Sequence, residues 1–189
     1  WALALPGRPP AEGRNQLILD LSRPEAAAFA EAAVRAVIKE ARPDYVKWDM
    51  NRPFSRAGGA APQGELRHRY VLALYGILRR VTRDFPEILF EGCAGGGGRM
   101  DFGMLPFFPQ SWASDDTDAA FRASIQHATG LLFPPLATGA HLSASPNHQT
   151  GRASSLLSRA LCAYGGVFGL ELDPTRMDEG ERAAAAALV

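Results

Sequence analysis

One octapeptide governs the interpretation of this chain: Tyr45-Val46-Lys47-Trp48-Asp49-Met50-Asn51-Arg52. Its alternation of apolar and polar residues is typical of a β-strand, in which successive side chains point to opposite faces. Lys47, Asp49 and Asn51 therefore share one face. A lysine on that face would keep the aspartate ionised, and an ionised carboxylate can attack an electrophilic carbon. Asp49 is thus a candidate nucleophile, although an ordinary Lys/Asp pair at a strand end fits these eight residues equally well.

Upstream of the octapeptide, the sequence predicts a strand and then a helix. Residues 17–21 form a short apolar run, and Ser22-Arg23-Pro24-Glu25 has the spacing of a capping box that opens a helix over 24–41. Pro43 ends this helix, and a strand over Tyr45–Asp49 follows at once. A strand, a helix and a second strand with a short return loop form a βαβ unit, which implies a parallel sheet.

Downstream, the same alternation continues to the end of the chain. A helix over about 66–85 carries apolar residues on one side and five arginines on the others, which predicts a solvated basic face. Further strands are expected at 88–91, 111–114, 136–140 and 167–172, and further helices at 118–128, 154–163 and 178–188. About six strand–helix repeats predict an α/β fold. An open doubly wound sheet can use six strands, whereas a (β/α)8 barrel needs eight and typically about 250 residues.

Composition and charge exclude several classes of function. The 20 basic residues balance 20 acidic ones, and neither sign forms a long block, so we expect no nucleic-acid or membrane partner. Cys93 and Cys162 lack the spacing of a zinc site or a disulfide framework and are expected to be thiols. The sequence shows no signal peptide and no apolar run of membrane length, although it opens on Trp1, and this pattern favours a cytoplasmic location.

A second group of carboxylates follows the strand expected at 111–114. Ser114-Asp115-Asp116-Thr117-Asp118 places three aspartates within four residues, and like-charge repulsion predicts that one of them is partly protonated. A protonated carboxyl group facing an ionised one is the arrangement that cleaves glycosidic bonds. Asp49 and Asp115 could be that pair. Alternatively, Asp116 and Asp118 cap the next helix, which we expect for Asp118.

Two further polar segments invite a binding interpretation. The glycine run after Glu91 could bind a phosphate or nucleotide, but no Lys-Ser or Lys-Thr follows it and its spacing does not match G-x-G-x-x-G. Glycines that let the backbone approach a bulky neutral ligand fit better. His141 and His148 could suggest a metal, but no third ligand lies at a useful spacing. We therefore expect no metal site, and a polar loop that orders itself by hydrogen bonds.

Long segments of the chain resemble the microbial α-galactosidases of glycoside hydrolase family 36, the melibiases. The residues that carry this resemblance are 44–52, 91–101 (Glu91-Gly92-Cys93-Ala94-Gly95-Gly96-Gly97-Gly98-Arg99-Met100-Asp101), 112–118, 140–152 and 168–173. Five segments in the same order are far more specific than one motif. The resemblance implies a (β/α)8 TIM barrel, here incomplete, with about strands 3 to 8 present. Residues 1–189 would be part of the catalytic barrel, without the family's N-terminal β-sandwich and C-terminal β domain.

The resemblance also implies roles for individual residues. It makes Asp49 the nucleophile and Asp115 the general acid/base of a retaining hydrolase that releases terminal α-galactose from substrates such as melibiose and raffinose. It assigns substrate binding to five residues: Arg14, Lys47, Asn51, Cys93 and Gly96. No cofactor is implied, the substrate is a small α-galactoside, and the full-length protein is expected to be a homo-oligomer. The chain departs from the family pattern at Ala113 and Met100, neither of which is a catalytic carboxylate.

Three alternatives to this assignment stay open at the level of sequence. A galactosyl transferase of the raffinose-synthase kind would intercept the same covalent intermediate with a sugar. A phosphate- or nucleotide-binding α/β protein would use the loop 95–98. Finally, the chain alone could be inactive: without the first two barrel strands, the strands that begin at Leu17 and Val167 would expose unpaired edges. We therefore expect the 189-residue chain on its own to aggregate or remain partly folded and to show no measurable α-galactosidase activity.

Overall fold

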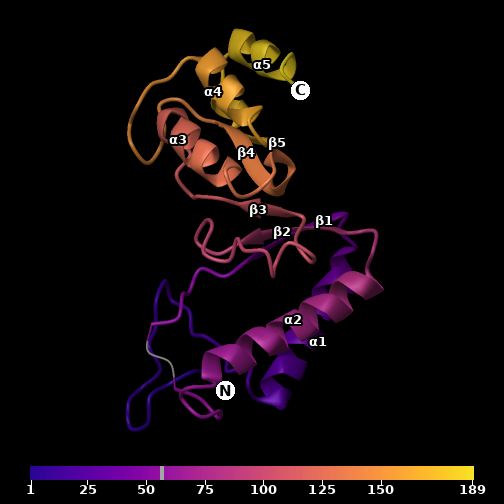
Figure 1. Cartoon of the computed structure of the whole chain (residues 1–189). Helices are drawn as coiled ribbons and strands as arrows, with labels where there is room; N and C mark the ends of the chain where they lie inside the picture. The colour runs from indigo at the N-terminus through magenta and orange to yellow at the C-terminus, as the bar shows by residue number, and fades with distance from the viewer. Residues whose placement is uncertain (56–57) are drawn as a thin grey trace. The chain divides into compact units, whose positions relative to one another are not determined.

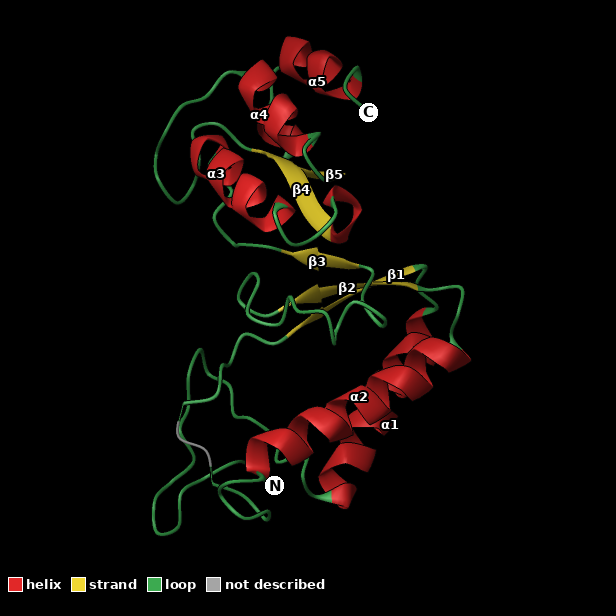
Figure 2. Cartoon of the chain, viewed as in Figure 1, coloured by secondary structure: helices red, strands yellow, loops and turns green. Residues whose placement is uncertain are grey.

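The computed structural model describes residues 1–55 and 58–189, which divide into two compact units, Trp1–Phe108 and Pro109–Val189. Parallel strands alternate with helices within each unit (Figures 1 and 2). The α/β class expected from the sequence is therefore confirmed. Both cysteines are free thiols, as predicted.

The first unit contains two helices and a parallel strand pair. Its elements are α1 (Pro24–Ala41), β1 (Tyr45–Asp49), α2 (Leu66–Asp84) and β2 (Leu89–Cys93). β1 pairs in parallel with β2, and α2 is the crossover between them. The apolar face of β1 packs on the same core as one side of α2, so the alternation predicted for the octapeptide is confirmed. The polar residues of β1 therefore point away from the core.

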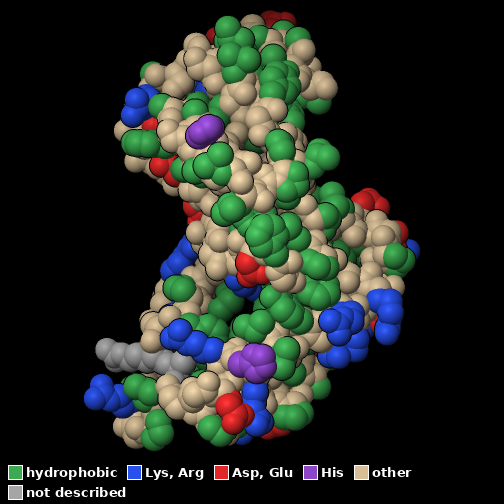
Figure 3. Space-filling view, in the orientation of Figure 1, with side chains coloured by type: hydrophobic (Ala, Val, Ile, Leu, Met, Phe, Trp, Pro, Cys, Tyr) green, Lys and Arg blue, Asp and Glu red, His purple; other side chains and the backbone are tan. Residues whose placement is uncertain are grey.

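The long helix α2 has the two-sided character that its sequence predicts. Its buried residues lie at helical spacing: Leu66, Tyr70, Leu74, Ile77, Leu78 and Val81. The five arginines of the helix are exposed, and basic side chains are visible at the surface around the helix pair (Figure 3). The arginines therefore form the solvated face that was expected. Phe85 follows the helix and is half-buried.

Two expectations upstream of β1 are wrong. Residues 17–21 form no strand, because their ladder consists of one isolated antiparallel bridge between Leu19 and Ala2. The buried Asp20 carboxylate instead accepts hydrogen bonds from the Ser22 and Ala60 backbone amides. The capping box is also absent. Arg23 is the N-cap residue of α1 and makes no capping side-chain hydrogen bond, since the Ser22 hydroxyl donates to Asp20.

The second unit repeats the strand–helix order three times. Its elements are β3 (Gln110–Trp112), α3 (Ala119–Gly130), the 3₁₀ turn η1 (Pro135–Ala137), β4 (Thr138–Ser143), α4 (Leu156–Ala163), β5 (Val167–Glu171), the 3₁₀ turn η2 (Pro174–Arg176) and α5 (Glu179–Ala186). β3 pairs in parallel with β4, and β4 with β5. The predicted elements are all present with shifted ends. Counting both units, the described residues form five strands instead of the six expected.

Candidate functional site

The carboxyl ends of β1 and β2 bring three of the expected site residues together. The parallel register places Lys47 beside Glu91 and Asp49 beside Cys93. In α/β folds this end of the strands is where ligands bind. Asp49 is exposed, so its carboxyl group is open to a ligand, whereas Cys93 is buried.

Asn51 links the candidate nucleophile to Arg14. Its side-chain amide donates a hydrogen bond of 2.6 Å from Nδ2 to Oδ2 of Asp49, and its Oδ1 accepts one of 2.8 Å from Nη1 of Arg14. A carboxylate can only accept hydrogen bonds and a guanidinium can only donate them, whereas an amide does both. Asn51 can therefore bridge the two groups and fix the orientation of the Asp49 carboxylate.

Arg14 lies in a tight turn with an unusual backbone. Arg14 and Asn15 have φ values of 52° and 56°, and Gly13 and Gln16 exchange backbone hydrogen bonds across them of 3.1 and 3.0 Å. Positive φ at both central residues is typical of a type I′ turn, and it is uncommon for a residue other than glycine, asparagine or aspartate. The turn holds the Arg14 guanidinium on Asn51, which is a reason for the chain to keep an arginine in this conformation.

Arg52 fastens the segment before this turn to the end of β1. Its Nη2 donates a hydrogen bond of 2.6 Å to the carbonyl oxygen of Ala11. Gly13 packs so closely on Arg52 that a Cβ atom there would lie 3.0 Å from the arginine side chain. Gly13 is therefore fitted to Arg52, and the buried Arg52 holds the loop that carries Arg14.

The glycine-rich loop after β2 folds back on itself beside Cys93. Gly95 and Gly96 have φ values of 59° and 80°, and the Ala94 amide donates to the Gly96 carbonyl at 2.8 Å. Such positive φ values suit glycine. Burial raises the pKa of the Cys93 thiol, and the neighbouring Asp49 carboxylate raises it further. This keeps Cys93 a neutral thiol, consistent with a residue that lines a site and does not act as a nucleophile.

Two functional candidates in this unit were missed by sequence reasoning. Glu91 is 2% exposed, accepts a hydrogen bond from the Tyr45 hydroxyl and lies 3.4 Å from the ammonium nitrogen of Lys47. Arg99 donates to the Cys93 and Trp48 carbonyl oxygens at 3.0 and 3.3 Å, so it ties the ends of both strands together. The signal for Glu91 was available, because a carboxylate inside a short buried strand needs a partner.

The other expected catalytic residue, Asp115, belongs to the second unit. It follows β3 and is exposed. The three aspartates have different surroundings. Asp116 Oδ1 accepts from the Asp118 amide at 3.0 Å, and Asp118 is the N-cap residue of α3, as predicted, with Oδ1 3.0 Å from the Ala120 amide nitrogen. Asp116 and Asp118 thus use carboxylate oxygens to order the backbone after Asp115, whose side chain is exposed.

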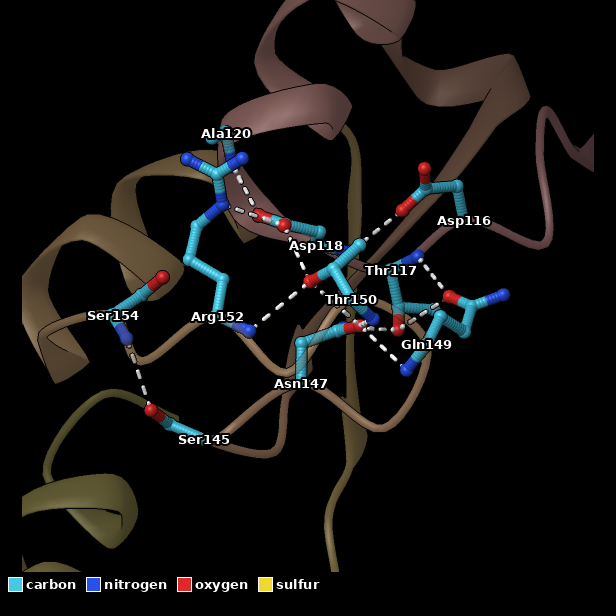
Figure 4. A network of polar contacts seen from close by, with 10 residues as sticks. All are labelled: Asp116, Thr117, Asp118, Ala120, Ser145, Asn147, Gln149, Thr150, Arg152 and Ser154. Carbon is cyan, nitrogen blue, oxygen red and sulfur yellow. Dashed lines mark hydrogen bonds and ion pairs between the residues drawn. The ribbon is translucent and has the colours of Figure 1, made fainter.

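Asp118 is fixed by a cation and by a hydroxyl group. Arg152 Nε and Thr150 Oγ1 lie 2.8 and 2.7 Å from its Oδ2 (Figure 4). Desolvation alone would raise the pKa of this buried carboxyl group, but the hydrogen bonds from Thr150, Ala120 and Arg152 outweigh it and lower the pKa. Asp118 is thus a structural anion, and the prediction that a carboxyl group of this cluster is partly protonated does not apply to it.

The histidine-containing segment after β4 orders itself by hydrogen bonds. Asn147 accepts the backbone amides of Gln149 and Thr150 at 2.9 and 3.1 Å, which confirms the expectation of a self-ordered polar loop. The centroid of the His141 ring lies 4.3 Å from that of the Trp112 ring.

Within residues 1–55 and 58–189, no group of three or more His, Cys, Asp or Glu side chains could hold a metal ion. In the same described ranges, no helix is both long and apolar enough to cross a membrane.

Comparison with known proteins gives consistent matches over the whole chain. The family model described as Melibiase matches residues 1–189. The alpha-galactosidase AgaA of Geobacillus stearothermophilus is 49% identical over 186 residues, which cover 96% of this chain and 26% of the relative. The alpha-galactosidase 1 of Pediococcus pentosaceus is 46% identical, covering 96% and 25%. The chain thus spans about a quarter of the length of these relatives.

Solved structures match equally well. The crystal structure of the family 36 alpha-galactosidase AgaA superposes with a TM-score of 0.95 at 47% identity, covering 100% of this chain and 27% of that one. The alpha-galactosidase of Lactobacillus brevis gives 0.94 at 41% identity, covering 100% and 26%. The match to these enzymes confirms the expected fold, an incomplete (β/α)8 barrel. Variants of AgaA have been crystallised in complex with stachyose and with raffinose.

Proposed function

Because the chain belongs to the melibiase family, we propose that the full-length protein is a retaining α-galactosidase that releases terminal galactose from raffinose-type α-galactosides. Support for the substrate class comes from the relatives, which are alpha-galactosidases, and from the AgaA complexes with stachyose and raffinose. The observation that carries the proposal is the exposed Asp49 carboxylate at the end of β1, oriented by Asn51 beside Lys47 and Cys93.

The proposed reaction has two displacements. Asp49 attacks the anomeric carbon of the galactosyl group while Asp115 gives a proton to the leaving oxygen, which forms a covalent galactosyl–Asp49 ester. Asp115, now ionised, accepts a proton from a water molecule as that water attacks the anomeric carbon, which breaks the ester bond to Asp49 and releases galactose. Two inversions at one carbon give net retention. Asn51 is suited to the first step because its hydrogen bond to Oδ2 fixes the orientation of the attacking Asp49 carboxylate.

The other site residues of the first unit supply binding. Lys47 and Arg14 carry N–H donors, which match the hydroxyl oxygens of a sugar. Cys93 is buried beside Asp49, and Gly96 follows in a loop where the lack of a side chain would let a neutral ring approach the backbone closely. Glu91 forms an ion pair with Lys47 from the buried side, since the lysine side chain is 40% exposed and the glutamate side chain only 2% exposed. The ammonium group can therefore face a substrate while its partner stays in the core.

The stereochemical course tests this function. Proton NMR of the full-length enzyme with raffinose is expected to detect α-galactose as the first anomer, before mutarotation produces the β-anomer. Retention follows from the covalent intermediate. β-Galactose as the first product would contradict the retaining mechanism, and the absence of any galactose would contradict the assignment as an α-galactosidase.

The pairing of Glu91 with Lys47 gives a second prediction. Glu91→Gln keeps the shape of the side chain but removes its charge, so the Lys47 ammonium is held less firmly toward the substrate. We expect KM for raffinose to rise about tenfold, or about 1.4 kcal/mol, through the loss of this ion pair, with a smaller change in kcat. Steady-state kinetics measures both. Glu87→Gln, a change at an exposed position just before β2, is the matched control and should leave KM unchanged.

An unchanged KM in Glu91→Gln would show that Lys47 does not depend on this carboxylate. An equal fall in kcat/KM for Glu87→Gln would show that the effect arises from the general charge of this region.

A further inference from the structure

We propose that Gln149 and Asn147 are positioning residues for Asp115, acting through Thr117. This inference rests on the proposed function, because it concerns the residue to which we assign the proton transfer. It is a statement about the second unit alone, in which all the contacts involved lie.

The segment between β3 and α3 is held by side chains at successive backbone amides. Asp116 donates its amide to Ser114 Oγ at 3.1 Å, and Asp118 donates its amide to Asp116 Oδ1 at 3.0 Å. Both of these bonds are made within the segment. The amide between them, that of Thr117, donates instead to Oε1 of Gln149 at 2.9 Å, a residue 32 positions away. Gln149 therefore anchors the middle of the short loop that carries Asp115, while Arg122 of α3 holds its start by donating from Nη1 to the Ser114 carbonyl oxygen at 2.9 Å.

Asn147 connects the same loop to the segment after β4 that contains Gln149. It is 5% exposed and uses both ends of its amide. Nδ2 donates to the Thr117 hydroxyl oxygen at 3.0 Å, and Oδ1 accepts from the Gln149 and Thr150 amides (Figure 4). The buried side-chain amide of Asn147 thus hydrogen-bonds to both loops and fixes one against the other. Both contacts to the Asp115 loop converge on Thr117, which is buried.

Asp115 can act as a general acid only if its carboxyl group is held in the right place. A general acid must lie within hydrogen-bond reach of the leaving oxygen, about 2.6–3.2 Å, and small displacements lose much of its contribution. Asp115 is exposed, and none of these hydrogen bonds between described residues reaches its carboxyl group, so its placement depends on the backbone of residues 114–118. The Arg152–Asp118 ion pair anchors the end of that segment at α3, and Gln149 and Asn147 anchor its middle.

The test uses the leaving-group dependence of kcat/KM in the full-length enzyme. The group displaced from raffinose is sucrose, whose alkoxide is a poor leaving group and needs a proton from Asp115, whereas a dinitrophenyl α-galactoside releases a stable phenolate that needs none. Gln149 is exposed, so Gln149→Ala is expected to fold. We expect it to lower kcat/KM for raffinose at least about tenfold more than for the dinitrophenyl substrate, a part of the ~10²–10⁴-fold that general acid catalysis contributes.

Two further variants separate positioning from stability. Gln149→Glu keeps an oxygen acceptor for the Thr117 amide and should retain most of the wild-type ratio between the two substrates. Ser155→Ala removes the N-cap hydrogen bond of α4 in the same unit without touching residues 114–118, and should lower both activities equally if it lowers them at all.

Equal losses on both substrates in Gln149→Ala, or a ratio in Gln149→Glu as low as in Gln149→Ala, would overturn the inference. Asp115→Ala distinguishes this outcome from a failure of the proposed function. If Asp115→Ala shows the leaving-group dependence and Gln149→Ala does not, the positioning role is wrong. If Asp115→Ala shows none, the assignment of Asp115 as the acid is wrong.

Discussion

Asp49→Ala in the full-length enzyme is expected to lower turnover of α-galactosides by at least about 10⁴-fold, because no covalent intermediate can form without the nucleophile. Azide should restore part of the activity with an activated aryl α-galactoside. The anion fits the space that the carboxylate vacates and attacks from that face, so the product should be the inverted β-galactosyl azide. Kinetics with and without azide, and NMR of the isolated product, measure both effects.

A matched control lies at the other end of the same strand. Asp44 immediately precedes β1 and is exposed, so Asp44→Asn removes a carboxylate of the same segment far from the proposed site. It should keep wild-type turnover and gain nothing from azide. Formation of the retained α-galactosyl azide by Asp49→Ala would mean that the roles of the two carboxylates are reversed.

Asp115→Ala is expected to have the second largest effect, and one that depends on the substrate. For raffinose, kcat/KM should fall by about 10²–10⁴-fold, the usual contribution of a general acid. For a dinitrophenyl α-galactoside, kcat/KM should change little, while kcat falls because water attacks the intermediate without a base. Azide needs no base, so it should raise kcat with this substrate and yield the retained α-galactosyl azide.

The neighbouring carboxylate provides the control for this variant. Asp116→Asn removes the adjacent charge and keeps the Oδ1 atom that accepts the Asp118 amide. Any fall in its kcat/KM relative to wild type should be the same for raffinose and for the dinitrophenyl substrate. If Asp116→Asn shows the dependence and Asp115→Ala does not, the acid is one residue further along the chain than we propose.

Local patterns predicted most of the fold. The helix 24–41 begins and ends where Pro24 and Pro43 place it, and the first five residues of the octapeptide, Tyr45–Asp49, form a strand whose two faces differ as the alternation predicts. The strand predicted at 17–21 is wrong, although the five residues alone have the apolar pattern of a buried strand. The decisive contacts are not local: Asp20 takes the amide of Ala60, 40 residues away, and the only ladder partner among the described residues is Ala2.

The site was predictable in its residue types but not in its connections. Strand alternation placed Lys47 and Asp49 on one face, whereas the roles of Arg14, Cys93 and Gly96 came from the resemblance to a family. The bridge from Asp49 through Asn51 to Arg14 joins residues 37 positions apart, and spacing carries no signal for it. The contact of Gln149 with Thr117 is similar, since it spans 32 positions and depends on how two loops fold.

The distance between the carboxyl groups of Asp49 and Asp115 tests the central proposal most directly. A crystal structure of the full-length enzyme measures it. We predict a separation of about 5 to 6 Å, because a retaining mechanism leaves no room for a water molecule between the carboxylate and the anomeric carbon. A separation above about 9 Å in a well-ordered structure would contradict the account, since about 6.5–9.5 Å is the range of inverting enzymes.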